Sequence, residues 1–328
     1  MGGSGVTSKP VVFALHRVPD PVADCLDAAF EMIWNQADTD VPIATLLDHA
    51  LRCDGFLTTV TDPVSAAVFA ASPGRLRIIA NFGVGVNLID LEAARRAGVI
   101  VTNTPGVLTD CTADLTIALM LMVLRRTGEG ERLVRTGRWT GWRPTAMLGA
   151  RVSGRTLGII GMGRIGRAVA TRAARGFGMT IRYHSRTPLP PSNAAELGAE
   201  PRPVDALLEE ADVVTLHCPL TAETAGMINA RRIARMRPTA VLINTARGGL
   251  IDDEALAAAL REGRIAGAGL DVYRDEPHVP SAFLDLENVV LLPHLGSATV
   301  ETRIAMGMMA FENLRSFFAG EPPPNRVV

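Results

Sequence analysis

The segment GMGRIG matches the pattern G-x-G-x-x-G, which binds the pyrophosphate of a dinucleotide when it joins a strand to a helix. The apolar run TLGII precedes it and RAVATRAARGFG follows it, so this context is present. Gly161 would allow the tight turn, Gly163 the approach of the pyrophosphate, and Gly166 close packing of the helix. The N–H groups of Arg164 and Ile165 would meet the phosphates. The alternative is a purely structural glycine turn.

A second stretch, YHSRT, ends the next predicted strand about 20 residues past the glycines, where NAD sites carry Asp or Glu for the ribose. This chain has Ser185 there, followed by Arg186 and Thr187. A carboxylate would repel a 2′-phosphate, whereas Arg186 could pair with it, and both hydroxyls could donate to it. The residues therefore favour NADPH over NADH, although NADH could still be used. The alternative is that Arg186 is solvated and stacks on adenine.

Three further polar residues follow predicted strands: Arg247 in NTARGGLIDDEAL, Glu276 in GLDVYRDEP and His294 in LLPHLGSAT. The carboxyl ends of parallel strands line the ligand crevice of an open α/β sheet, so the three side chains could converge on one site. Taken singly, Arg247 could cap a turn, Glu276 could be a surface residue, and His294 could be an ordinary core residue. Their occurrence together with a cofactor motif favours a shared site.

Short apolar strands alternate with helix-length segments, which predicts parallel sheets covered by helices on both faces. The first series of strands is VVFAL, GFLTTV, RIIANFG and VIVTNTP. The second series is TLGII, MTIRYHS, ADVVTLHCP, AVLINTA, GAGLDV and NVVLLPH. Two such series in 328 residues predict two doubly wound α/β domains. The helical segment from Ser297 to Phe318 is expected to pack back on the first domain, which would make that domain discontinuous.

The segment from Gly106 to Ala150 fits neither series. It begins with a long predicted helix and continues into GRWTGWRP, which places Trp139 and Trp142 in a polar loop. The two indoles could be buried against their own domain. The loop could instead be an arm that reaches a second subunit, because aromatic residues favour interface cores. The sequence leaves both interpretations open.

The composition argues against several classes of protein. The net charge of −1 creates no global field for nucleic acid or anionic lipid. The longest apolar run, IALMLMVL, is far shorter than the ~20 residues of a membrane span, and MGGSGVTSKP reads as a loose tail without a signal core. The four cysteines show no metal-like spacing, so we expect neither a metal site nor a disulfide framework. We expect a cytoplasmic protein without nucleic-acid or membrane partners.

Over nearly its whole length the sequence resembles the D-isomer-specific 2-hydroxyacid dehydrogenase family. The resemblance is carried by NFGVGVNLID, NTPGVLTD, GRTLGIIGMGRIG, LHCPLTAET and LPHLGSAT. It is strongest toward the glyoxylate and hydroxypyruvate reductases, in TNTPGVLTDCTAD, GEGERLVRTGRWTGWRP and YHSRT. The family implies a flavodoxin-like substrate domain (1–105 and 297–328) and a Rossmann NAD(P)-binding domain (106–296) with the active site in the cleft between them. A dimerisation arm would lie near 125–150.

The resemblance also implies residue roles. Arg247 would bind substrate, His294 would be the acid/base and Glu276 its partner, while the N–H groups of Val84 and Gly85 would bind the substrate carboxylate. Asp271 would hold the nicotinamide carboxamide, and Trp142 would reach the partner's substrate pocket in a homodimer. Further cofactor contacts are implied at Thr109, Cys218, Pro219, Thr245, Ala246 and Gly296.

One residue departs from the family pattern. Close glyoxylate reductases tend to have an aromatic residue, often Tyr, where this chain has Val86 in GVGVNLID. The substitution removes bulk and a hydroxyl near the carboxylate-binding loop, so a longer 2-keto acid becomes conceivable.

The sequence therefore predicts an NADPH-preferring reductase of small 2-keto acids that yields D-2-hydroxy acids, with glyoxylate and hydroxypyruvate as leading substrates. Protonated His294 would supply the proton and the nicotinamide the hydride. One alternative is a reductase of larger keto acids such as 2-ketogluconate. Another is a nucleotide-sensing corepressor on the same scaffold, against which the lack of extended tails or charge runs argues.

Overall fold

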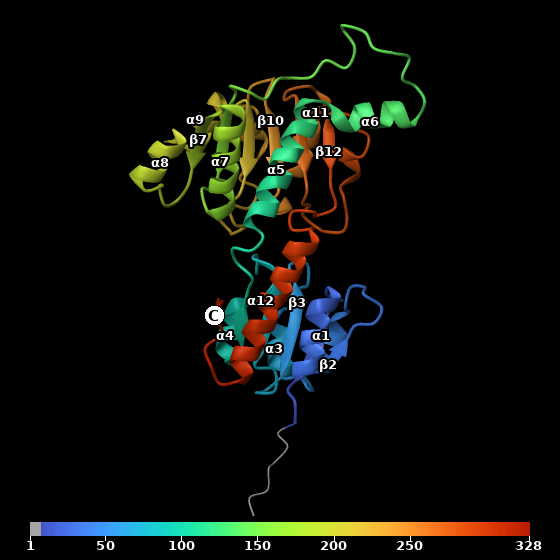
Figure 1. Ribbon diagram of the computed structural model, residues 1–328, viewed down its shortest axis with the longest axis vertical. Helices are drawn as coiled ribbons and strands as arrows, with labels where there is room; N and C mark the ends of the chain where they lie inside the picture. Colours follow the sequence, from blue (N-terminus) through green and yellow to red (C-terminus); the bar gives the residue numbers. More distant parts are fainter. Residues whose placement is uncertain (1–7) are drawn as a thin grey trace, which may run out of the picture. The chain divides into compact units, whose positions relative to one another are not determined.

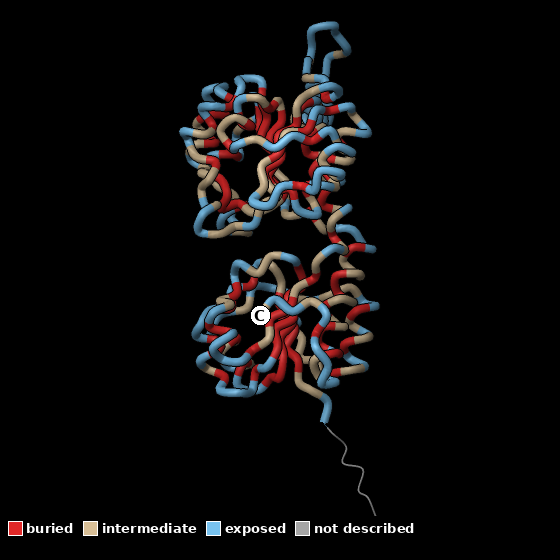
Figure 2. Tube along the Cα trace, turned by 90° about the vertical axis from the view of Figure 1, so that its left-hand side faces the viewer, coloured by how far each residue is buried: buried red, intermediate tan, exposed pale blue. Residues whose placement is uncertain are grey.

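The computed structural model describes residues 8–328, so most of the predicted tail MGGSGVTSKP lies outside the described residues. The chain divides into two compact units, Met1–Leu108 with Thr299–Val328 and Thr109–Ala298. Each unit contains one parallel sheet with helices packed against it (Figure 1), and buried residues gather inside each unit (Figure 2). This confirms the predicted fold class of two parallel-sheet α/β domains. No helix among residues 8–328 has the length and apolar character needed to cross a membrane.

The first unit is a five-stranded sheet in the order β2-β1-β3-β4-β5, with all neighbouring strands parallel. Its strands are β1 (Val11–Ala14), β2 (Glu31–Trp34), β3 (Gly55–Thr59), β4 (Ile78–Phe82) and β5 (Ile100–Thr102). Its helices are α1 (Asp20–Ala29), α2 (Ile43–Ala50), α3 (Ala66–Ala71), α4 (Leu91–Ala97) and α12 (Val300–Phe318). The sequence did not predict β2, an edge strand without a fully buried residue.

The alternation of side chains explains how the helices of this unit are placed. Phe13, Phe56 and Ile79 point to a core shared with α2, α3 and α4, which pack in a row. Helix α12 packs over β4 and against α1. The C-terminal residues then pair with the sheet edge, where the Val327 N–H donates to the Val101 carbonyl at 2.7 Å. Both ends of the chain therefore build this unit.

The second unit is a seven-stranded parallel sheet in the order β12-β11-β10-β9-β6-β7-β8. Its strands are β6 (Thr156–Ile160), β7 (Thr180–His184), β8 (Glu200–Pro201), β9 (Val213–Leu216), β10 (Val241–Asn244), β11 (Gly267–Leu270) and β12 (Val289–Leu291). Its helices are α5 (Thr109–Leu124), α6 (Thr127–Arg135), α7 (Arg164–Phe177), α8 (Pro191–Leu197), α9 (Val204–Glu210), α10 (Ala230–Ile233) and α11 (Asp253–Arg261), with short 3₁₀ turns η1 (Gly248–Leu250) and η2 (Ser281–Phe283).

Two apolar clusters hold this sheet between its helices. Helices α5 and α7 pack together over one cluster, and α9, α10 and α11 pack over the other. The strand order reverses between β6 and β9. The loops after these two strands therefore form the switch point where open parallel sheets bind ligands.

The segment after α6 runs as a long loop to β6 (Figure 1). Trp139 and Trp142 are 58% and 81% exposed, so the indoles are not buried against their own domain. Val134 on α6 and Leu148 near the end of the loop are also exposed. This accumulation of exposed apolar side chains is the feature of the loop that needs an explanation.

Candidate active site

The three glycines of GMGRIG serve different steric needs. Gly161 has φ +102°, and a Cβ on it would lie 2.5 Å from the backbone nitrogen of Cys218. A Cβ on Gly166 would lie 2.1 Å from the Gly161 carbonyl oxygen. Around Gly163, by contrast, a Cβ would meet no atom of the described chain within 4 Å. Packing thus requires the outer two glycines, while the middle one leaves the backbone open to a ligand.

Helix α7 begins directly behind this opening, with Gly163 as its N-cap. Its first N–H groups, including those of Arg164 and Ile165, lack intrahelical acceptors because they lie in the first turn. The Gly161 N–H donates to the His184 carbonyl at 2.8 Å and ties the loop to the end of β7. The chain thus fits the pyrophosphate of a nicotinamide dinucleotide at this helix end.

Cys218 and Pro219 follow β9 on the other side of the switch point. The Cys218 sulfur lies 3.8 Å from that of Met227, and burial raises the pKa of its thiol to about 11. The thiol is therefore protonated at neutral pH and its side chain acts in packing. Pro219 is exposed.

The YHSRT turn is anchored by a buried tyrosine and exposes residues that can donate hydrogen bonds. Tyr183 is buried, and its hydroxyl accepts from the Leu189 N–H at 3.1 Å, which fixes the turn between them. Ser185 is half-buried, whereas Arg186 and Thr187 are exposed. The positive charge of Arg186 acts on Cys218 and on Glu223, so it lies near the loop after β9.

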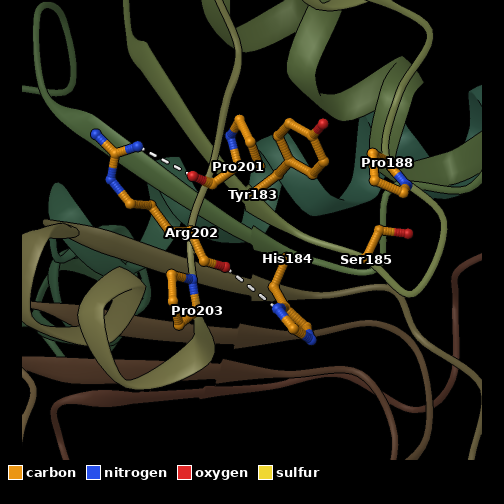
Figure 3. A pocket seen from close by; sticks show the side chains of 7 residues that line it. All are labelled: Tyr183, His184, Ser185, Pro188, Pro201, Arg202 and Pro203. Atoms are coloured by element: carbon orange, nitrogen blue, oxygen red, sulfur yellow. Dashed lines mark hydrogen bonds between the residues drawn. The ribbon is translucent and has the colours of Figure 1, made fainter.

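A small pocket of about 210 Å³ opens beside this turn (Figure 3). His184 donates from Nδ1 to the Arg202 carbonyl at 3.2 Å and closes one side. None of the residues that line the pocket is a carboxylate: Tyr183, His184, Ser185, Pro188, Pro201, Arg202 and Pro203. Arg202 in this wall is ion-paired with Glu200 at 2.7 Å and with Glu210 at 3.0 Å.

His294 and Glu276 form a close pair. The Nδ1 atom of His294 lies 2.6 Å from Oε2 of Glu276, while Oε1 of Glu276 accepts from the Tyr273 N–H at 2.9 Å. Burial alone would raise the pKa of Glu276, but its hydrogen bond with His294 and the Tyr273 N–H lower it. Both carboxylate oxygens are thus engaged, which fixes the imidazole and leaves Nε2 as the nitrogen that can serve a substrate.

The backbone of His294 is held in an unusual conformation, with φ +54°. Its N–H donates to the Asp271 carbonyl at 2.9 Å. The Asp271 carboxylate accepts from the Leu295 N–H at 2.6 Å and from the Gly296 N–H at 2.8 Å. Asp271 is fully buried. It therefore holds the loop in a left-handed conformation that a non-glycine residue seldom adopts unaided.

Arg247 follows β10 in a loop shaped by Asn244. The Asn244 side chain donates to the Arg247 carbonyl at 2.9 Å and accepts from the Ala246 N–H at 3.0 Å. A Cβ on Gly248 would lie 2.0 Å from the Tyr273 carbonyl carbon, so this glycine lets the two loops touch. Burial lowers the pKa of Arg247 and the Glu276 charge opposes that effect, which puts the two charges within electrostatic reach.

Helix α5 braces the ends of these strands. Thr245 and Thr116 pair through their hydroxyls at 2.9 Å, and the Thr112 hydroxyl donates to the Gly296 carbonyl at 2.9 Å. Thr109 is the first residue of the helix. Asn244, Thr112 and Thr116 were not predicted from the sequence, although an Asn directly after the apolar run AVLI is a signal that could have found the first.

The remaining predicted positions belong to other parts of the chain. Val84 and Gly85 follow β4 in the first unit, with Val84 38% exposed. Trp142 lies on the exposed loop after α6. The structure thus brings Arg247, Glu276 and His294 to one edge of the second sheet.

Comparison with known proteins agrees with this geometry. Residues 117–296 match the family described as D-isomer specific 2-hydroxyacid dehydrogenase, NAD binding domain. The glyoxylate reductase of Korarchaeum cryptofilum is 47% identical over 321 residues, which cover 97% of this chain and 96% of the relative.

Two solved structures extend the comparison. A D-isomer specific 2-hydroxyacid dehydrogenase from Polaromonas superposes with a TM-score of 0.91 at 38% identity, covering 98% of this chain and 100% of that one. An NADPH-dependent glyoxylate/hydroxypyruvate reductase from Sinorhizobium meliloti, solved with NADP and malonate, has a TM-score of 0.85 at 38% identity, covering 98% and 97%.

Proposed function

Because the chain belongs to the D-isomer specific 2-hydroxyacid dehydrogenase family of NAD(P)-dependent oxidoreductases, we propose that it reduces small 2-keto acids to D-2-hydroxy acids with NADPH. Glyoxylate and hydroxypyruvate are the leading substrates, since similar proteins carry those activities in their names. The observation that carries the proposal is the 2.6 Å contact between His294 and Glu276, with Arg247 in electrostatic reach.

His294 is the proposed proton donor. When bound, the nicotinamide supplies the hydride. The developing alkoxide needs a proton, which Nε2 of a protonated His294 can give, and such general acid catalysis contributes about 10²–10⁴-fold. Glu276 orients the ring through Nδ1 and favours the imidazolium with its negative charge. Asp271 keeps the loop of His294 in place, and its carboxylate is the proposed acceptor for the nicotinamide carboxamide.

Arg247 and the loop after β4 are the proposed anchors of the substrate. The guanidinium of Arg247 can grip the carboxylate and polarise the ketone. The N–H groups of Val84 and Gly85 would bind the same carboxylate. Val86 has no aromatic bulk, and its half-buried side chain packs on the core of the first unit. The missing aromatic bulk is the observation that favours the alternative, a reductase of longer 2-keto acids such as 2-ketogluconate.

The preference for NADPH rests on the YHSRT turn. Ser185 and Arg186 occupy the place of the ribose-binding carboxylate, and the neighbouring pocket wall has no carboxylate. The doubly charged 2′-phosphate matches a guanidinium with adjacent hydroxyl donors. The NADP complex of the Sinorhizobium meliloti enzyme adds support.

We also propose a homodimer built on α6 and the loop that follows it. Val134, Trp139, Trp142 and Leu148 are all more than half exposed, and large aromatic residues dominate the buried centres of interfaces. In this proposal Trp142 enters the substrate pocket of the partner.

A keto-acid panel tests the proposed activity. Oxidation of NADPH and of NADH would be followed with glyoxylate, hydroxypyruvate, pyruvate and 2-ketogluconate. We expect the highest kcat/KM with glyoxylate or hydroxypyruvate and NADPH, and D-glycerate as the product of hydroxypyruvate. Binding of NADPH without turnover of any keto acid would favour the nucleotide-sensing alternative.

A further inference from the structure

The loop after β4 is held by side-chain amides at three consecutive carbonyl groups. Asn81, which is 1% exposed, donates from Nδ2 to the Gly83 carbonyl at 3.2 Å and to the Gly85 carbonyl at 3.0 Å. Asn103 donates from Nδ2 to the Val84 carbonyl at 2.9 Å. Asn81 is itself held, because its Oδ1 accepts from the Thr58 hydroxyl at 3.2 Å.

These contacts determine where the N–H groups point. In a trans peptide the C=O of one residue and the N–H of the next point in opposite directions. The Gly83 carbonyl, held by Asn81 and by the Thr104 N–H at 2.9 Å, therefore directs the Val84 N–H away from Asn81. The Val84 carbonyl, held by Asn103, directs the Gly85 N–H away from Asn103. Within residues 8–328, neither the Val84 N–H nor the Gly85 N–H donates a hydrogen bond to another group of the chain.

Asn103 is connected to the C-terminal segment. Its carbonyl accepts from Asn313 Nδ2 at 3.2 Å, and its N–H donates to the Asn325 carbonyl at 3.1 Å. The Asn325 N–H in turn donates to Asn313 Oδ1 at 3.0 Å. Asn313 is fully buried on α12. The residue that holds the Val84 carbonyl is thus fixed through its own backbone by the last helix and tail.

We propose that Asn81 and Asn103 are positioning residues that preorganise the N–H groups of Val84 and Gly85 to bind the substrate carboxylate. This inference rests on the proposed function, because it names the residues that support the proposed contact between the loop after β4 and the substrate carboxylate. An oriented pair of N–H groups binds a carboxylate without reorganisation when the substrate arrives. Loss of a supporting amide should therefore weaken carboxylate binding while the proton donor and cofactor cradle stay intact.

The test variant is Asn103→Leu, which preserves approximate volume but cannot donate to the Val84 carbonyl. We expect KM for glyoxylate to rise about 5-fold, the effect of one neutral hydrogen bond. The inhibition constant of oxalate, an unreactive dicarboxylate, should rise by a similar factor. KM for NADPH and kcat should stay within about twofold, because the loop contacts neither the phosphates nor the proton donor in this proposal.

A second test variant and a control variant separate an effect on this loop from a general effect on folding. The double variant Thr58→Val/Asn81→Leu removes the side-chain donor to the Gly83 and Gly85 carbonyls without leaving the Thr58 hydroxyl unpaired, and should also raise both constants. Asn325→Ala is the matched control, because Asn325 contacts the network only through its backbone. It should leave both constants unchanged. Thermal unfolding of each variant would be measured alongside.

The possible outcomes separate this inference from the proposed function. Raised glyoxylate and oxalate constants in both test variants, with cofactor binding unchanged, support it. If the parent reduces glyoxylate but both variants keep the parental constants, the inference alone is wrong. Equal loss of NADPH binding, kcat and thermal stability would also overturn it, because the amides would then support the fold in general. A parent that reduces no 2-keto acid would overturn the proposed function and this inference together.

Discussion

Glu276 contacts two groups at once, and its environment explains why it is ionised. Burial works against the carboxylate, yet His294 and the Tyr273 N–H together lower its pKa below the ordinary value of 4.5. At neutral pH the group therefore presents a full negative charge to Nδ1 of His294. The same charge reaches Arg247. A single carboxylate thus orients the proposed acid and balances the buried guanidinium.

Replacing Glu276 by Gln should shift the pH dependence of reduction toward lower pH. The hydrogen bond with His294 lowers the pKa of Glu276, so in the parent a carboxylate charge faces the proposed proton donor, and Gln removes that charge. We expect the falling limb of kcat/KM against pH to move down by about one unit. Glu276→Asp should shift it less. An identical profile in parent and Glu276→Gln would remove Glu276 from the mechanism.

His16 provides a pH-dependent contribution to stability in the first unit. Its Nε2 lies 2.9 Å from Asp62 Oδ1, and this hydrogen bond, opposed by burial, raises the pKa of His16 above 6.5. Asp62 also accepts from the Thr59 N–H at 2.7 Å, and Asp38 Oδ1 lies 3.5 Å from His16 Nδ1. Because the folded-state pKa is raised, the contribution is complete below about pH 6.5 and is lost as pH rises through the raised value.

The variant His16→Gln, which stays neutral, tests this effect. The difference in Tm between parent and variant should be larger at pH 6 than at pH 9. The prediction is contradicted if the difference is the same at both values, or larger at pH 9. Both measurements lie well above the ordinary Asp pKa of 3.8, so titration of Asp62 does not interfere.

At the residue scale, the sequence predicted the candidate catalytic residues better than the residues that hold them in place. Arg247, Glu276 and His294 stood out because each follows an apolar strand. Asp271 was assigned to the cofactor, and that role stays a prediction; its acceptance of hydrogen bonds from the Leu295 and Gly296 N–H groups was not predicted. Such contacts join residues 24 and 25 positions apart. They depend on how the loops meet and leave no local pattern in the chain.

Among the elements, the loops that follow parallel strands carry the proposed chemistry. The loop after β6 opens at Gly163, the turn after β7 carries Ser185 and Arg186, and the loop after β12 carries His294. Strand pairing sets the loops of Arg247, Glu276 and His294 side by side, because β10, β11 and β12 are neighbours in register. The sheet therefore provides a rigid edge on which a few polar residues determine function.

The turn after β7 should determine the choice of cofactor. A charge-assisted contact between Arg186 and the 2′-phosphate predicts roughly 10–150-fold higher kcat/KM with NADPH than with NADH. Arg186→Ala should remove most of this preference by raising KM for NADPH, with little effect on NADH. Adding Ser185→Asp should invert it. Equal weakening of both cofactors by Arg186→Ala would show that the side chain only stacks on adenine.

The buried strands and long helices were predictable from the sequence, while two edge strands were not. Runs such as GIIGMG and AVLIN are apolar enough to mark buried parallel strands. By contrast, β2 has only an exposed and three half-buried residues, and β8 consists of two exposed residues. Their pairing with a neighbour defines them as strands, and that information lies outside the local pattern.

At the scale of the whole molecule, the chain builds its first unit from both ends and its second from the middle. Residues after Thr299 therefore pack with strands formed more than 200 positions earlier, as in the contact between Asn313 and Asn103. The exposed Trp139 and Trp142 indicate an interaction beyond a single chain. A single copy exposes apolar side chains that a second copy could cover.

The proposed homodimer predicts twice the monomer mass of 34.9 kDa by light scattering at micromolar concentration. Trp142→Ala should raise KM for the keto acid, because the indole is proposed to enter the partner's pocket, and it should change KM for NADPH little. Glu31→Ala on an exposed edge-strand position serves as the control. A monomeric parent would rule out both the dimer and the role of Trp142.

The central claim is that His294 donates the proton during reduction of a 2-keto acid, and His294→Ala tests it most directly. Single-turnover reduction of glyoxylate by the NADPH-loaded enzyme would be compared between parent and variant, with NADPH affinity measured by its fluorescence. Removing a general acid should slow the reaction by about 10²–10⁴-fold while the dissociation constant of NADPH stays within about twofold. A variant that reduces glyoxylate within threefold of the parent rate would contradict the account.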